Sequence, residues 1–391
     1  TGAGGKGSAP TSEGVADESG FSGYELDTAR EPVVVGATAL FVLVFPYVFA
    51  RMPVVSDLFQ GYQGLATLIL IWAIFALGFD LLLGYTGLLS FGHAAFWGGS
   101  AYAAGVFSEY AASALGFEPG PIPVVVVGTL FAVLLAWILG FLSLRRGGIY
   151  FSILTLAFAQ MFFYLASSPL AGVTGGENGF TAVAVGHLLG TFELEAELPS
   201  ILGTLMGTWL YAFVAVVTVL CVAAAYRILN SPYGMVFRAI RENEQRTEFV
   251  GLNVWRYKLM SFVLSGAFAG VAGSLFTIHG NYVPLQSLYW TESGEIVIMA
   301  VLGGAGSLFG PMLGAGIYLW FENIVSGVQD LTIPFTEIVL IQGFGAYWHL
   351  LLGVLFVLVV WFFPRGIWGL FQDARDAVGS RDANAESGGE R

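Results

Sequence analysis

The sequence predicts an all-α polytopic membrane protein, and three observations carry that prediction. Hydrophobic residues make up 56% of the 391 residues, and mean hydropathy is +0.76. Charged residues make up only 11%, whereas a soluble domain carries about 25%. The apolar residues are also gathered into long runs, and a membrane-crossing helix needs about 20 of them in succession.

These runs predict about ten transmembrane helices, each close to the required length. The predicted spans are 32–50, 63–83, 92–115, 123–144, 149–167, 205–226, 259–279, 294–309, 311–327 and 347–364. The pair on either side of Gly310 and Pro311 is short and broken by glycine, so it forms either two spans or a re-entrant hairpin. A hairpin would reduce the number to about eight.

The sequence divides into a membrane domain at 32–369 and two acidic tails, 1–31 and 370–391. Eleven of the 27 acidic residues lie in residues 1–31 and 372–391, a composition that predicts disorder. No signal-peptide pattern is evident in the first tail. The net charge of −12 fits a prokaryote adapted to salt.

The basic residues predict the orientation. If the spans alternate and Arg145, Arg146, Arg365 and the loop 227–258 share one side, fourteen of the fifteen Lys and Arg residues lie on that side. Arg51 is the exception. The positive-inside rule therefore predicts a multi-pass protein of the cell (cytoplasmic) membrane with both termini and this loop in the cytoplasm.

The loop 227–258 is the one long segment with charges of both signs between apolar runs, and it holds six of the fifteen basic residues. Val236, Ile240 and Phe249 are candidates for one apolar face of a short helix. Such a helix suits docking into the groove of a soluble partner. The alternative is an ordinary solvated loop.

Glycine interruptions indicate where a transport pathway lies. Two similar stretches, 84–92 and 303–310, each join an inward run to an outward run, and paired breaks of this kind mark transport sites built from discontinuous helices. The pathway candidates are Asp80, Tyr85, Gly87, Ser90, His93, Gly304, Gly306 and Ser307. The alternative is that the glycines only pack helices, as in the GxxxG patterns at 266–270 and 310–314.

Acidic residues are few in the predicted spans, where a charge at the bilayer centre costs about 2.5–3.5 kcal/mol. Asp80 either bonds backbone N–H groups freed by the helix break or binds a polar group of a solute. Glu295 and Glu322 are predicted near the outer ends of their spans, in contact with solvent. His93 is expected to hydrogen-bond locally.

Catalytic, metal and cofactor sites are not predicted. The four histidines lack zinc-ligand spacing, and Cys221 lies alone in an apolar run. Neither Lys6 nor Lys258 completes a phosphate-binding P-loop. We therefore expect no enzyme activity here, and any ATP hydrolysis would belong to another polypeptide.

Five motifs in order resemble the branched-chain (hydrophobic) amino acid ABC importer permeases, specifically the larger, LivM-like subunit. They are GYTGLLSFGHAAF at 84–96, TGGENGFT at 174–181, RAIRENE at 238–244 with GLN at 251–253, VLGGAGSLFGP at 301–311 and FPRGIWG at 363–369. The resemblance implies a permease that pairs with a LivH-like permease, two ABC ATPase subunits and an extracytoplasmic solute-binding protein.

The resemblance also implies roles for residues. The ATPase-coupling candidates are Arg238, Arg241, Glu242, Glu244 and Gly251. The outer-loop candidates, expected to contact the solute-binding protein, are Gly175, Gly176, Glu177 and Asn178.

The solute is less sharply indicated than the family. Asp80 and Leu88 stand where many amino acid permeases of this family carry Asn and Gln, and Asp80 with GYTGLLS is similar to the urea and short-chain amide branch. The alternatives are therefore an amide permease, a stand-alone secondary transporter, or an intramembrane enzyme. We expect branched-chain amino acid import.

Overall fold

The computed structural model describes residues 31–52, 56, 60–145, 147–328, 330–332, 339–342, 344–363 and 365–370. The two predicted tails lie almost entirely outside the described residues, so their predicted disorder stays a prediction.

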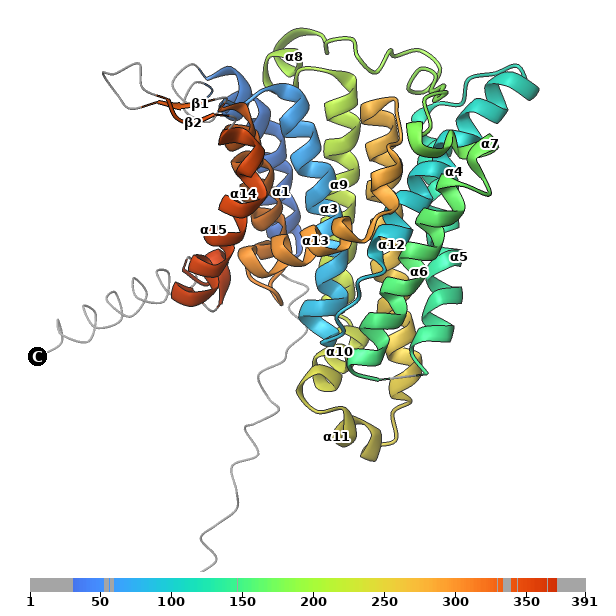
Figure 1. Cartoon of the computed structure of the whole chain (residues 1–391), viewed down its shortest axis with the longest axis vertical. Helices are drawn as coiled ribbons and strands as arrows, with labels where there is room; N and C mark the ends of the chain where they lie inside the picture. Colours follow the sequence, from blue (N-terminus) through green and yellow to red (C-terminus); the bar gives the residue numbers. More distant parts are fainter. Residues whose placement is uncertain are drawn as a thin grey trace, which may run out of the picture.

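Helices dominate the described chain (Figure 1). The long helices are α1 (Glu31–Pro46), α3 (Gln63–Thr86), α4 (His93–Ala114), α5 (Pro121–Ser143), α6 (Ile149–Ser167), α9 (Trp209–Leu229), α12 (Val254–Gly280), α13 (Trp290–Gly303), α14 (Gly310–Gly327) and α15 (Trp348–Phe362). The short elements are η3 (Tyr47–Arg51), α7 (Ala171–Thr174), η4 (Gly176–Asn178), α8 (Ser200–Met206), α10 (Pro232–Glu242), α11 (Glu244–Phe249), η5 (Leu285–Leu288) and η6 (Phe344–Tyr347).

The helical class is therefore confirmed, with one small addition. Strands β1 (Asp330–Thr332) and β2 (Val339–Gln342) form a two-stranded antiparallel ribbon between α14 and α15. The sequence did not predict this ribbon.

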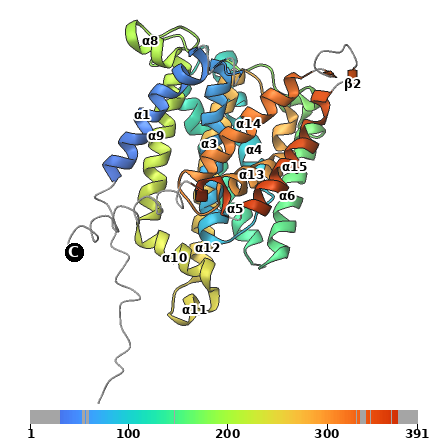
Figure 2. The same cartoon turned by 90° about the vertical axis from the view of Figure 1, so that its left-hand side faces the viewer.

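Helix α3 is the centre of the bundle, and α12, α14 and α9 pack around it (Figures 1 and 2). Its side chains are apolar on every face, and nearly all of them are buried. A helix that is apolar all round lies in the core of a protein or spans a membrane. Helix α3 takes the core position, whereas α1 and α15 expose many apolar side chains.

Small residues let α12 approach α5 closely. A Cβ atom at Gly266 would lie 2.5 Å from Cβ of Ala136, and one at Gly270 would lie 2.6 Å from Cβ of Ala132. Backbone contact of this kind replaces the hydrophobic effect as a driving force inside a membrane. The predicted role of the 266–270 pattern in helix packing is confirmed.

Helices α13 and α14 form the pair that the sequence left as two spans or a hairpin. Helix α13 has 14 residues, which gives about 21 Å at 1.5 Å per residue. That is shorter than the hydrocarbon core of about 30 Å. Helix α14 begins at Gly310 with Pro311 in its first turn, so the predicted break lies at the correct place.

Seven helices of the described chain are long and apolar enough to cross a membrane: Glu31–Arg51, Gln63–Thr86, Pro121–Ser143, Ile149–Ser167, Trp209–Leu229, Val254–Gly280 and Gly345–Leu370. The predicted number of about ten is not confirmed. Helices α4, α13 and α14 account for the difference, because each lies at a predicted span but is not among these seven helices.

The bundle has two distinct ends (Figures 1 and 2). Helices α10 and α11 project from one end, which we call the inner end, while α8 and the β-ribbon lie at the opposite, outer end. Glu31 at the start of α1 pairs with Arg227 near the end of α9 at 2.6 Å, so both lie at the inner end. Arg51 lies at the outer end, where its guanidinium donates to the Gly203 carbonyl at 2.9 Å.

Candidate functional site

The two glycine-rich interruptions meet at the inner end of the bundle. Asp80, nearly two turns before the end of α3, is fully buried. Its two carboxylate oxygens accept the backbone N–H of Gly306, at 2.9 and 3.0 Å. Asp80 therefore binds a backbone N–H group that the helix break leaves without a helical partner. Of its two predicted roles, this is the structural role and not the binding of a solute.

Glycine is needed at both sides of this contact. A Cβ atom at Gly84 would overlap the Asp80 carboxylate and the backbone nitrogen of Gly306. Gly306 itself has φ of 89°, in the left-handed region that favours glycine. The chain thus passes close enough for a side-chain carboxylate to bind a main-chain turn.

Helix α10 directs two arginines back into the membrane domain. The Arg241 guanidinium donates to the Gly84 carbonyl near the end of α3. The Arg238 guanidinium donates to the Leu229 carbonyl at the end of α9, at 3.0 Å, and lies over the Tyr85 ring, 5.6 Å from its centroid. Cations at helix C-termini are favourable because the carbonyls there carry partial negative charge.

The apolar side chains of α10 and α11 divide between the bundle and solvent. Phe237 and Ile240 of α10 are buried against the bundle. Asn243 ends α10, and its side chain caps α11 by accepting the N–H of Arg246 at 3.0 Å. At the end of α11, Phe249 is 89% exposed and Val250 81% exposed.

The predicted apolar face of this segment is therefore partly wrong. Ile240 faces the bundle as predicted, but its partner is Phe237 rather than Val236, and Phe249 points into solvent. The break at Asn243 changes the helical phase between α10 and α11, so a single helical pattern cannot run through both.

A polar cavity of about 600 Å³ lies at the inner end, between α11 and the loop that joins α5 to α6. Glu244 and Lys258 line it and form an ion pair at 2.6 Å. Gly251 lines it too, with φ of 89°. Glu242 is exposed on α10.

The remaining pathway candidates bind backbone or pack in the core. His93 is fully buried, with its Nε2 2.7 Å from Oγ of Ser265 and aromatic rings around it. Ser90 accepts the Gly92 N–H at 3.2 Å. Ser307 donates to the Gly304 carbonyl at 2.8 Å.

Two helices begin within the bundle, as a discontinuous-helix transporter requires. The segment 87–92 leads from the inner end to the start of α4, and 281–289 leads from the outer end to the start of α13. The two starts meet where the Ala94 N–H donates to Oγ of Ser293 at 2.8 Å. Discontinuous helices of this kind surround solute sites near the middle of transporters.

The outer loop packs on the segment that leads into α13. Gly175 and Gly176 have φ of 80° and 61°, and they shape the turn in which Glu177 and Asn178 are exposed. The Asn178 carbonyl accepts the Tyr282 hydroxyl at 3.0 Å. The four predicted outer-loop residues therefore form one turn.

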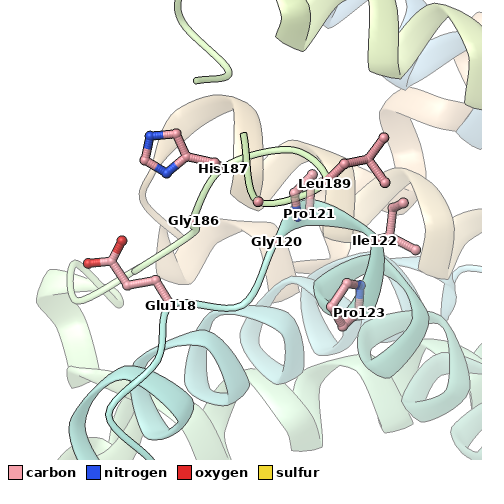
Figure 3. Close-up of a pocket in the computed structure, with 9 residues that line it drawn as sticks. Glu118, Gly120, Pro121, Ile122, Pro123, Gly186, His187 and Leu189 are labelled. Carbon is pink, nitrogen blue, oxygen red and sulfur yellow. The ribbon is translucent and has the colours of Figure 1, made fainter. Parts of the chain in front are cut away.

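A second cavity, of about 420 Å³, lies at the outer end between residues 118–123 and 186–190 (Figure 3). Glu118 and His187 lie on its rim, and both are exposed. This cavity is at the end of the bundle opposite the glycine turns and contains none of the predicted site residues.

Comparison with known proteins decides the family. Residues 61–360 match the family model described as "Branched-chain amino acid transport system / permease component". The chain belongs to this family. The resemblance seen in the five sequence motifs is confirmed, and with it the prediction of a transport permease.

Curated relatives cover most of this permease. It is 29% identical over 352 residues to the high-affinity branched-chain amino acid transport permease LivM of Escherichia coli, covering 87% of this chain and 75% of the relative. It is 28% identical to LivM of Salmonella typhimurium, with the same coverage. It is 27% identical to a probable LivM of Methanocaldococcus jannaschii, covering 66% of this chain and 74% of the relative.

The permease also carries an acidic group that sequence reasoning missed. Glu292, in the first turn of α13, has a buried carboxylate oxygen without a hydrogen-bond partner in the described chain. Glu295 and Glu322 are half-buried beside it, and the Tyr318 hydroxyl hydrogen-bonds Glu295. The prediction that Glu295 and Glu322 are simply solvated at span ends is therefore wrong.

Proposed function

We propose that this chain is the LivM-like permease subunit of an ATP-binding-cassette importer for branched-chain amino acids. It pairs with a LivH-like permease, and the solute passes between the two. Two separate ATPase subunits supply the energy, and a solute-binding protein delivers the solute. Family membership and the names of the LivM relatives support the solute class.

One observation carries the coupling to an ATPase. The segment α10–α11 projects from the inner end, with Arg238 and Arg241 directed into the bundle and Phe249 and Val250 directed away from it. Exposed aromatic side chains on such a projection are typical anchors for a protein groove. We propose that the inner end faces the cytoplasm, with both termini, and that α11 docks on the ATPase.

The Phe249→Asp variant tests this docking. We expect it to insert normally and to lose most of the co-purifying ATPase, because a central aromatic anchor contributes about 2 kcal/mol or more to a protein interface. The matched control is Leu189→Asp, which places the same charge on a 72% exposed residue at the outer end. Equal ATPase recovery with both variants would exclude docking through Phe249.

The outer turn is proposed to contact the solute-binding protein. Glu177 is exposed there and forms no hydrogen bond within the described chain. We expect Glu177→Lys to lower uptake at limiting binding protein several-fold, with ATPase co-purification unchanged, because rim charges act mainly on association rate. Uptake kinetics at varied binding-protein concentration measure this. An unchanged half-saturating concentration would contradict the contact.

The alternative solute is urea or a short-chain amide. It was favoured in the sequence by Asp80, but the Asp80 carboxylate is already bound to the Gly306 backbone, so it is not free to select a solute. Leucine and urea binding to the accompanying solute-binding protein distinguishes the two.

A further inference from the structure

Arg241, like Arg238, is directed from α10 towards the membrane domain, but it alone of the two contacts the first glycine-rich interruption through the Gly84 carbonyl. Its guanidinium reaches away from the projecting surface and donates to the Gly84 carbonyl. Its aliphatic stem crosses Gly87, where a Cβ atom would lie 3.2 Å from Cγ of Arg241. A partner that docks on the exposed side of α11 would not need this side chain.

The Arg241 guanidinium also lies against the second glycine turn. A Cβ atom at Gly306 would lie 2.8 Å from Nη1 of Arg241 and 3.2 Å from the Gly84 carbonyl oxygen. Gly306 is the residue whose N–H binds Asp80, which is on the same helix as Gly84 and one turn before it. Arg241, Gly84, Asp80 and Gly306 therefore form one continuous set of contacts.

This set joins three elements of the permease, and it runs from the exposed Arg241 to the buried Asp80. Helix α10 is attached through Arg241, α3 through Gly84 and Asp80, and the α13–α14 turn through Gly306. Each link in the set is a hydrogen bond to a backbone group: the Arg241 guanidinium binds the Gly84 carbonyl, and the Asp80 carboxyl group binds the Gly306 N–H. Displacement of α10 therefore acts on both glycine turns at once.

We propose that Arg241 is a positioning residue that transmits movement of α10 to the glycine turns, and that it is not a contact for the ATPase. The inference rests on the proposed function, since the movement originates in an ATPase docked on α11. The inference gives different roles to two residues of α10–α11. Phe249 binds the ATPase, and Arg241 transmits the movement of α10 to the glycine turns at 84–92 and 303–310.

The test uses the complete complex of this chain, its partner permease, the ATPases and the solute-binding protein in proteoliposomes. For Arg241→Gln we expect unchanged ATPase co-purification and about a tenfold fall in solute transported per ATP hydrolysed, the size expected for one charge-assisted hydrogen bond. Arg241→Lys, which keeps the cation, should restore part of the ratio. Arg256→Gln, the same substitution at an exposed arginine in the first turn of α12, is the control.

Two results overturn the inference: loss of co-purifying ATPase in Arg241→Gln, as in Phe249→Asp, or an unchanged transport-to-hydrolysis ratio. If Arg241→Gln does not assemble, the double variant Asp80→Asn with Arg241→Gln replaces both side chains. Its transport-to-hydrolysis ratio should be no lower than that of Asp80→Asn alone, since coupled residues are non-additive, and a lower ratio contradicts the inference. Failure of the unmodified chain to bind any ATPase would reject the proposed function instead.

Discussion

Asp80→Leu is expected to destabilise the permease strongly, whereas Asp80→Asn should leave it folded. Leucine removes the acceptor of the Gly306 N–H, and a buried donor left without a partner costs about 1–3 kcal/mol. Asparagine keeps one acceptor oxygen in the same place.

Thermal unfolding in detergent, followed by size-exclusion chromatography, measures the difference. Asp80→Leu should lower the midpoint by several degrees or prevent accumulation, and Asp80→Asn should remain near the unmodified protein. The solute profile of Asp80→Asn should be unchanged, because the carboxylate binds backbone. A changed preference between leucine and urea in that variant would return Asp80 to a solute-binding role.

Gly314→Ala should disrupt the pairing of α13 and α14. A Cβ atom at Gly314 would overlap the Met299 carbonyl and lie 2.8 Å from the Gly303 nitrogen. Both contacts are with backbone, which cannot rotate away, so the two helices must separate. Overpacking of this kind costs about 1–3 kcal/mol, and the displaced turn also carries Gly306.

The matched control lies on the same helix. A Cβ atom at Gly316 would be 3.6 Å from the Ile69 side chain, an ordinary contact. Gly316→Ala should therefore be neutral or slightly stabilising, since alanine is favoured over glycine in helices by about 1 kcal/mol. Uptake and unfolding temperature should fall only in Gly314→Ala; equal behaviour of the two variants would show that close approach at Gly314 is unimportant.

The sequence predicted the features that depend on local composition. Apolar runs marked the bundle, and the spacing of Gly266 and Gly270 marked a close helix contact. The breaks at 84–92 and 303–310 and the bonding of Asp80 to freed backbone were also anticipated. Each of these follows from residue type and spacing along one segment.

Features that depend on neighbouring elements could not be predicted in this way. Arg241 lies between the buried Ile240 and the exposed Glu242, so its neighbours in the sequence do not show where its side chain points. The guanidinium is directed by the Gly84 carbonyl on another helix. The chain that leads into α13 pairs at Val283 with Phe180 of the outer loop, a contact between distant segments that hydropathy does not indicate. Glu292 was missed for the same reason, because its segment looked like an outer loop.

In the proposed function, separate ATPase subunits drive this permease through α10–α11. The most direct measurement is leucine uptake into proteoliposomes that contain the permease pair and binding protein, with and without the ATPases and ATP. We predict accumulation only when both ATPases and ATP are present, and its loss with Phe249→Asp. Leucine accumulation by the permeases alone would contradict the account.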